Sequence, residues 1–270
     1  MNNKKKNRFF GIYYKHQSVS GYTLSVIDSF SNEGKMVQII TSDKAYLLKD
    51  TSQINISKEG IEFSINQEDL KISGSIKYQN LSKPNKDIMS YFRYLPIECK
   101  HNIYSMHHDI SGNLLINNES ISFDNGDGYM EGDEGRNFPK EYLWFNASKS
   151  DSSITLAIAD IPLGLFHILG NTCLIKYKDK EYRFGTYNFS KVKKLSRKEI
   201  ILKKGSYTLE INILDDSSFH PLKAPKKGDM ICYIHECPSL PARYILKKKN
   251  DILIDTTHPF ASFEYMFKDK

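Results

Sequence analysis

Apolar and polar residues alternate with a period of two along the whole chain, and this alternation constrains the fold more than any other feature. It occurs at residues 23–27, 37–40, 61–65, 70–78, 114–116, 154–158, 174–177, 200–202, 207–213, 252–254 and 263–267. Because a β-strand points successive side chains to opposite faces, each of these stretches predicts a strand. Helical periodicity is limited to one short turn expected around residues 85–91, after Pro84.

Turn-forming residues separate the alternating stretches, at residues 117–118, 178–180, 204–205 and 249–251. Such spacing indicates a series of antiparallel hairpins, whereas parallel α/β folds need crossover helices. Short antiparallel strands must close or stack to cover their edges, and the chain shows no repeat at the blade period of a propeller. We therefore predict an all-β protein with two lobes, a barrel or sandwich of antiparallel strands with little helix. The lobes are expected at residues 1–137 and 138–270, with the least strand-like region, 124–140, crossing between them.

Composition and motifs argue against a nucleic-acid-binding protein, a zinc protein and a membrane-spanning protein. The chain has 270 residues with a net charge of +6, and it carries none of the known nucleic-acid-binding signatures. Its lysine clusters, for example at residues 4–6 and 247–249, are expected at solvated turns, with transient contact to a membrane surface as the alternative. Four unevenly spaced cysteines predict free thiols and no zinc site. No apolar run suits a signal peptide or membrane helix, so a cytoplasmic location is expected.

A segment rich in glycine and acidic residues, 124–144, stands out from the rest of the chain. Gly126, Gly128, Gly132 and Gly135 fall within ten residues of one another. If Tyr129, Glu131 and Asp133 share a strand, their side chains lie on one face about 6.6 Å apart, and crowding raises the pKa of one carboxyl. The alternatives are a solvated acidic turn and a calcium loop, although the donor spacing does not fit an EF-hand.

The same segment resembles the signature of the tocopherol cyclase family, including its shorter bacterial members. It reads G-x-G-Y-M-E-x-D-x-G-x-x-F-P-x-x-Y-x-W from Gly126 to Trp144. Shorter similar stretches follow the family order at residues 11–17, 87–99, 105–112, 159–162, 234–236 and 261–265. The resemblance implies a two-lobed lipocalin-like β fold of the wider carotenoid hydratase superfamily, with the signature near the seam between the lobes.

The resemblance also implies a reaction: protonation of a prenyl double bond, followed by addition of an oxygen nucleophile, without a cofactor or metal. An alkene is a weak base, so this chemistry needs a positioned carboxylic acid in a water-poor cavity. Glu131 is the expected acid, with Asp133 raising its pKa. Tyr129 and Trp144 are expected to stabilise the cation through their aromatic faces, and Tyr142 to contact the substrate. Histidine titrates near neutrality, so His108 and His16 are expected to relay the phenolic proton.

Three functions remain open at this stage. The first is a cyclase or hydratase acting on a prenylated phenol, a polyene or another hydrophobic small molecule. The second is a carrier that binds an apolar ligand without reaction, and the third is a glycan-active protein with Glu131 and Asp133 as paired carboxyls. Position 134 is Glu where the related proteins commonly have Trp or Arg, so tocopherol itself is not predicted as the substrate.

Overall fold

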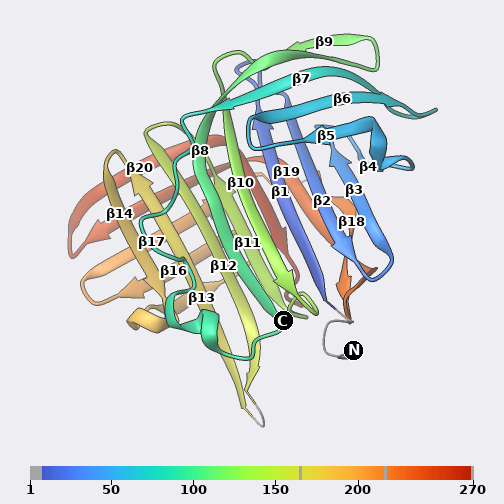
Figure 1. Ribbon diagram of the computed structural model, residues 1–270. Helices are drawn as coiled ribbons and strands as arrows, with labels where there is room; N and C mark the ends of the chain where they lie inside the picture. Colours follow the sequence, from blue (N-terminus) through green and yellow to red (C-terminus); the bar gives the residue numbers. More distant parts are fainter. Residues whose placement is uncertain (1–7, 164–165, 216–217, 269–270) are drawn as a thin grey trace.

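Two curled antiparallel sheets make up the computed structural model, which describes residues 8–163, 166–215 and 218–268 (Figure 1). The described residues contain no α-helix. Their helical elements are three short 3-10 helices, η1 (Thr51–Gln53), η2 (Ser90–Tyr94) and η3 (Thr186–Asn188). The predicted all-β, lipocalin-like class with little helix is therefore confirmed. None of these helices is long and apolar enough to cross a membrane.

The first sheet contains ten strands in the order β4-β3-β2-β1-β10-β8-β7-β6-β5, and β9 pairs with β8. Their bounds are β1 (Phe9–Gln17), β2 (Thr23–Ser31), β3 (Gly34–Ile40), β4 (Ala45–Leu47), β5 (Ile54–Ile56), β6 (Gly60–Asn66), β7 (Lys71–Gln79), β8 (Cys99–Ile116), β9 (Glu119–Ser122) and β10 (Gly126–Gly135).

The second sheet repeats this arrangement, in the order β14-β13-β12-β11-β20-β19-β17-β16-β15, and β18 pairs with β19. Its strands are β11 (Tyr142–Ala147), β12 (Ser152–Leu163), β13 (Phe166–Tyr177), β14 (Lys180–Gly185), β15 (Lys191–Leu195), β16 (Glu199–Lys204), β17 (Tyr207–Ile213), β18 (His220–Lys226), β19 (Asp229–Lys248) and β20 (Asp251–Tyr265).

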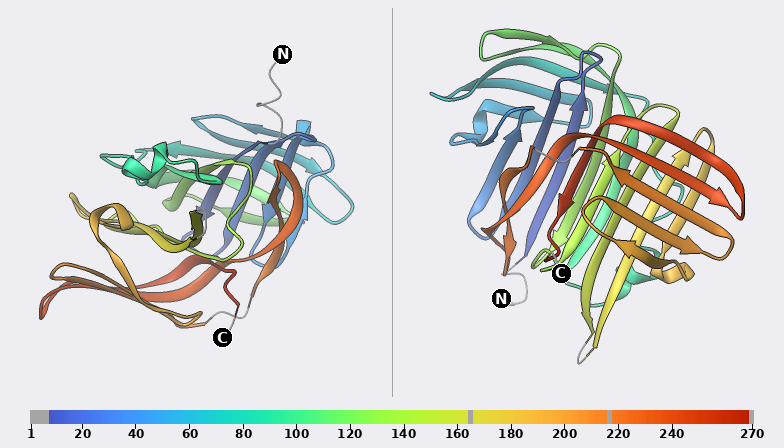
Figure 2. Two further views of the ribbon diagram at one scale, coloured as in Figure 1. Left: turned by 90° about the horizontal axis from the view of Figure 1, so that it is seen from below. Right: turned by 180° about the vertical axis from the view of Figure 1, so that it is seen from behind.

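Each sheet has its own hydrophobic core, because alternate residues of its strands point inward. Leu24, Val26 and Ile72 belong to the first core, and Phe145, Leu156 and Tyr244 to the second. A third, smaller cluster that includes Tyr13, Tyr129 and Trp144 lies between the sheets. Seen from below, the blue-to-green and yellow-to-red strands form two layers (Figure 2). We call the space between the facing surfaces of these layers the seam.

The hairpin predictions hold where turn residues have a positive φ, as at Asn117, Asn118, Lys178, Gly205 and Lys249. The expected helical turn forms a few residues later than predicted, as η2.

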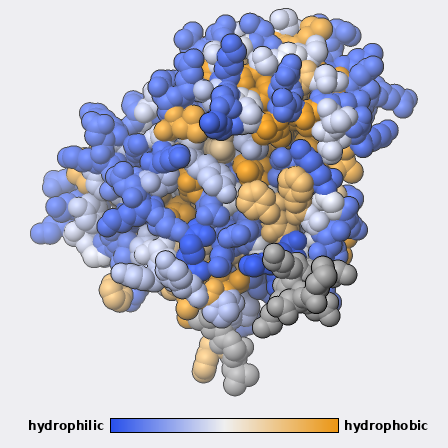
Figure 3. All heavy atoms as spheres, viewed as in Figure 1, coloured by the Kyte–Doolittle hydropathy of each residue, from blue (hydrophilic) through white to orange (hydrophobic). Residues whose placement is uncertain are grey.

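All four cysteines, Cys99, Cys173, Cys232 and Cys237, are free, as predicted. Lys4 to Lys6 lie outside the described residues. Hydrophilic side chains cover most of the face drawn in Figure 3, with apolar groups between them.

The prediction that residues 124–140 form a connection was wrong, because residues 126–135 form β10, a central strand between β1 and β8. Its glycines give room to neighbouring groups. A Cβ on Gly128 would lie 2.2 Å from Nε2 of His108, and one on Gly132 would lie 2.8 Å from the Tyr104 ring. Glycine therefore reflects close packing here, and the link between the sheets shrinks to residues 136–141.

Candidate active site

Two rows of side chains face each other across the seam. Residues paired on neighbouring antiparallel strands point to the same face, so the strand register defines each row. The first sheet contributes Ile27, Tyr13, Glu131 and Ile103 from β2, β1, β10 and β8. The second contributes Glu236, Glu264, Trp144 and Ala157 from β19, β20, β11 and β12. The rows bring three glutamates into the space between the two cores.

Glu131 is buried and receives its polar contacts on one oxygen. Its Oε2 accepts hydrogen bonds from the Tyr129 hydroxyl at 2.5 Å and the Trp144 indole N–H at 3.0 Å, and lies 3.4 Å from Nε2 of His101. Burial raises the pKa of Glu131 to about 7, against the opposing effect of the His101 charge. The carboxyl is therefore poised to exchange a proton near neutrality, and Oε1 is the oxygen without these contacts.

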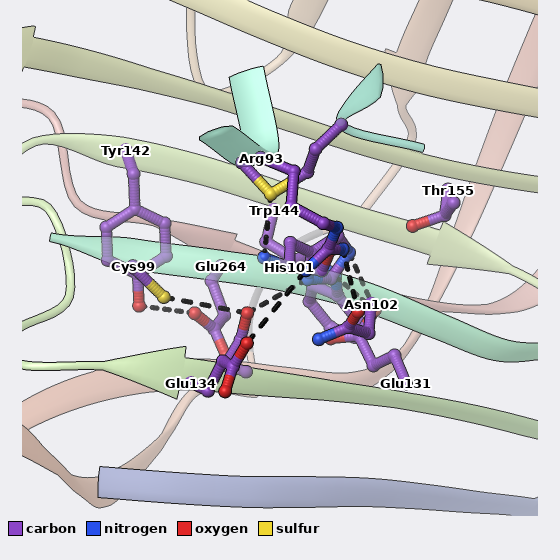
Figure 4. A network of polar contacts seen from close by, with 12 residues as sticks. Arg93, Cys99, His101, Asn102, Glu131, Glu134, Tyr142, Trp144, Thr155 and Glu264 are labelled. Atoms are coloured by element: carbon purple, nitrogen blue, oxygen red, sulfur yellow. Dashed lines mark hydrogen bonds and ion pairs between the residues drawn. The ribbon is translucent and has the colours of Figure 1, made fainter. Parts of the chain in front are cut away.

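His101 and Glu131 belong to one network of polar contacts (Figure 4), and His101 also contacts Asp133. Its Nδ1 lies 3.0 Å from Oδ1 of Asp133, which is the cross-strand partner of His101 in the β8–β10 register. Burial opposes a charge on the ring, but the carboxylates of Glu131 and Asp133 prevail and raise the pKa of His101 to about 9. The imidazole is thus positively charged at neutral pH and can return a proton to Glu131.

A second glutamate, Glu236, is held by a chain of buried polar groups. Its Oε1 accepts a hydrogen bond of 2.6 Å from the Tyr13 hydroxyl, which lies 3.4 Å from Oγ of Ser262. Lys15 Nζ donates to that Oγ at 2.8 Å and to the carbonyl of Phe260 at 2.6 Å. Burial raises the pKa of Glu236 to about 7 and lowers that of Lys15 to about 7. Proton transfer between the cavity and a buried amine has a continuous route here.

The third glutamate, Glu264, has a different environment. The Tyr142 hydroxyl donates a hydrogen bond to its Oε2. Burial raises the pKa of Glu264 well above its usual value, and the nearby charges of Glu236, Glu131 and Asp133 raise it further. These surroundings favour the protonated form of this carboxyl.

A cavity of about 500 Å³ opens onto these groups. Glu131, Glu236 and Glu264 all line it, and its walls include apolar residues such as Phe92, Ile97 and Phe138. Ligand sites in proteins typically combine such a volume with mainly apolar walls and a few polar groups. The arrangement can bind a hydrophobic molecule and transfer protons to or from it.

The structure brings together most of the site residues predicted from the sequence. Glu131, Asp133, Trp144 and Tyr142 line the cavity, and Tyr129 contacts Glu131 from the adjoining buried position. His16 and His108 are not among the lining residues. They lie on the other face of β10, where they flank Gly128 in the strand register.

Glu134 alternates away from the cavity and is not among its lining residues. Its side chain is 43% exposed and lies 4.0 Å from the Arg93 guanidinium. The third acid of the signature therefore adds no buried charge to the site.

Sequence reasoning missed His101 as a candidate, and it cited Glu236 and Glu264 only within stretches that resemble the family. His101 reaches Asp133 through the β8–β10 register, which the alternation of either strand does not reveal. Glu264 and Ser262 alternate with Ala261 and Phe263, which are buried in the second core. Such alternation ordinarily places the polar residues on the solvent face, so the sequence gives no sign that Glu264 is buried.

His101, Glu131 and Asp133 also form a group whose ligand atoms lie within 4.8 Å of one another, close enough that they could hold a metal ion. Within the described residues, Tyr129 and Trp144 donate hydrogen bonds to Glu131, and Nδ1 of His101 pairs with Asp133. The buried Nε2 of His101 has no hydrogen-bond partner and lies 3.4 Å from Oε2 of Glu131.

Solved structures with this fold include two proteins of known name. Kievitone hydratase from Nectria haematococca is 9% identical, with 98% of this chain and 90% of that chain covered and a TM-score of 0.55. CghA is 7% identical, with 96% and 88% covered and a TM-score of 0.61, and its structure with Sch210972 gives 0.60. The likeness is one of fold. No protein-family model and no curated protein sequence matches the chain.

Proposed function

We propose that this protein is a cofactor-independent enzyme of the cyclase or hydratase type. In this reaction, Glu131 protonates a carbon–carbon double bond of an apolar ligand, and an oxygen nucleophile adds to the resulting cation. The observation that carries the proposal is a buried carboxyl, with its pKa near 7, that lines an apolar cavity and is hydrogen-bonded to an indole. A general acid works best when its pKa lies near the working pH.

The contacts of Glu131 suggest which oxygen reacts. Tyr129, Trp144 and His101 all approach Oε2, which leaves Oε1 to present a proton to the ligand. As the proton leaves, negative charge develops on the carboxylate, and these donors stabilise it. The cation that forms on the ligand is stabilised by the rings of Trp144 and Tyr13, which lie 5.3 Å apart at the cavity wall.

The nucleophile must lose a proton when its oxygen bonds to carbon, and Glu236 is the proposed acceptor. The C–H and C–O bonds form while the O–H bonds of Glu131 and of the nucleophile break, so the reaction consumes no oxidant or reductant. The charge of Lys15 favours the carboxylate form of Glu236. His101 then returns a proton to Glu131 and is itself reprotonated by solvent, and Glu236 releases the proton it accepted to solvent, which restores both carboxyls for the next turnover.

Prenylated phenols and polyenes are the proposed substrate class, as the resemblance to tocopherol cyclases suggests. The named neighbour kievitone hydratase supports a reaction of the hydratase type on this fold. A carrier without activity would bind its ligand through the apolar walls of the cavity. That function does not explain why three glutamates are buried in the same cavity. A glycan-active protein is disfavoured, because the carboxyls face a largely apolar cavity.

The test uses 2-prenylphenol, whose hydroxyl can close a ring onto its own double bond, with product detected by mass spectrometry. Glu131→Gln keeps the shape of the side chain but removes its proton, so we expect turnover to fall by at least about 10²-fold while the probe still binds. Full activity of this variant would refute Glu131 as the acid. No turnover by the wild type of 2-prenylphenol, other prenylated phenols or polyenes would favour the carrier, and mass spectrometry of copurifying lipids would then identify its ligand.

Asp133→Asn is the companion variant. Removing a neighbouring negative charge lowers the pKa of Glu131, so activity should persist but decline at a lower pH than in the wild type. Loss of activity at every pH would instead indicate a direct part for Asp133 in proton transfer.

A further inference from the structure

We propose that Glu264 binds the ligand as a neutral carboxylic acid, donating a hydrogen bond to a carbonyl oxygen, and that the substrate class is therefore carbonyl-bearing. This inference rests on the proposed function for the use of the cavity, but it concerns a different group from the proton donor. It narrows the ligand from any apolar alkene to one with a ketone-type oxygen.

The position of Glu264 is set by its strand neighbours. Its Cα partners are Glu236 on β19 and Trp144 on β11, and both of these side chains line the cavity with it. Paired side chains in an antiparallel sheet lie about 5 Å apart at Cβ. Two carboxyls this close in a buried site do not both ionise readily.

The cations in the site are placed beside the other carboxyls. His101 contacts Glu131 and Asp133, and the chain through Tyr13 and Ser262 connects Lys15 to Glu236. The groups that act on Glu264 are Tyr142, Glu236, Glu131 and Asp133, and within the described structure none of these carries a positive charge. The fold therefore keeps Glu264 protonated and leaves ionisation to its neighbours.

A protonated carboxyl has one O–H donor, and the Tyr142 hydroxyl does not use it because that hydroxyl donates to Oε2. A buried donor without an acceptor costs free energy, which a ligand that supplies an acceptor recovers. The other cavity carboxyls, when ionised, accept hydrogen bonds from ligand hydroxyls. Glu264 complements them by selecting a carbonyl oxygen, as neutral carboxylic acids do in other enzyme sites.

The protonation state can be tested on the protein without any ligand. At pH 7.5, Glu131 and Glu236 are partly protonated because their pKa values lie near 7, so the wild type is compared with Glu264→Gln in a difference spectrum. That difference should contain the C=O stretch of one protonated carboxylic acid. Glu134→Gln is the control, because Glu134 is partly exposed and does not line the cavity, and this variant should retain the band. An unchanged spectrum in a folded Glu264→Gln variant would overturn the proposal.

The ligand preference can be tested with 4-chromanone and chroman, which share a ring system and differ in one ketone. The wild type should bind 4-chromanone about 3- to 10-fold more tightly, the range of one net hydrogen bond. Glu264→Met should abolish this preference, whereas Glu264→Gln, which keeps a donor and is the closest replacement in shape, should preserve it. Equal binding of the two probes by the wild type, or an unchanged preference in Glu264→Met, would overturn the ligand assignment.

These measurements separate the two proposals. Glu131→Gln should keep both the ketone preference and the Glu264 band while losing turnover. A wild type without turnover but with the preference and the band would refute the proposed function alone. Turnover without either would refute the role of Glu264 alone.

Discussion

The two faces of β10 carry two buried polar clusters with opposite electrostatic character. On the face toward the seam, His101 lies between Glu131 and Asp133 and its pKa is raised to about 9. On the other face, burial lowers the pKa of His16 to about 4 and that of His108 to about 3. One strand thus separates a charged imidazole from two neutral ones.

The difference comes from the partners of each ring. His16 contacts the Tyr78 hydroxyl at 2.7 Å and the carbonyl of Leu24 at 3.0 Å, and neither carries a charge. Both ring nitrogens of the buried His108 are without a hydrogen-bond partner. Burial penalises a charged histidine unless a carboxylate is near. Among the described residues, carboxylates act on His101, whereas none is among the groups that shift the pKa of His16 or His108. The charged imidazole thus lies on the face that lines the cavity.

The largest expected effect concerns the packing on the face of β10 that carries His16 and His108. Gly128→Ala places a Cβ within 3 Å of three atoms of the His108 ring, which is itself buried. We expect the free energy of unfolding to fall by about 3 kcal/mol, the upper end for overpacking. Gly11→Ala is the matched control, since its Cβ would meet nothing closer than 3.7 Å. Equal urea denaturation midpoints for the two variants would contradict this account.

The second effect is a pH dependence of stability on the neutral face. Because the pKa of His108 is lower in the folded protein than in the unfolded chain, the unfolded state takes up protons first, and stability falls as the pH drops below about 6.5. At pH 5 one such histidine costs about 2 kcal/mol. His108→Leu should lose about that much less stability than the wild type between pH 7 and pH 5. Parallel curves for the two proteins would show that His108 is not buried in its neutral form.

The third effect is on the charged face, where NMR of the imidazole nitrogens can follow each ring. His101 should stay protonated at pH 8, while His16 and His108 should still be neutral at pH 5.5. Asp133→Asn removes one of the two carboxylates and should lower the pKa of His101 by about one unit or more. If His101 titrates near pH 6.5 in the wild type, the pairing with Glu131 and Asp133 is wrong.

The smallest expected effect is that of metal removal. The ligand spacing in the sequence predicts no structural metal, and Nδ1 of His101 already pairs with Asp133. Dialysis against a chelator should leave the melting temperature unchanged. A clear decrease that added metal reverses would show that His101, Glu131 and Asp133 hold an ion.

The sequence predicted the fold class well because strand alternation and turn chemistry are local. It failed at β10, where glycines that usually mark a loop instead accommodate the rings of His108 and Tyr104. For the site, Glu131, Asp133 and Trp144 could be named because one segment carries them all. His101 could not, because its place beside Asp133 depends on the pairing of strands more than 30 residues apart in the chain.

The side chains of the seam rows largely lie outside the two large cores. Glu131, Glu236 and Glu264 hydrogen-bond to tyrosines between the sheets, while Phe145 and Leu24 belong to clusters that do not include them. Substitutions in the rows can therefore change which protons are available without repacking either sheet. For protein engineering, this is a scaffold in which acid–base chemistry can be redesigned almost independently of the packing that maintains the fold.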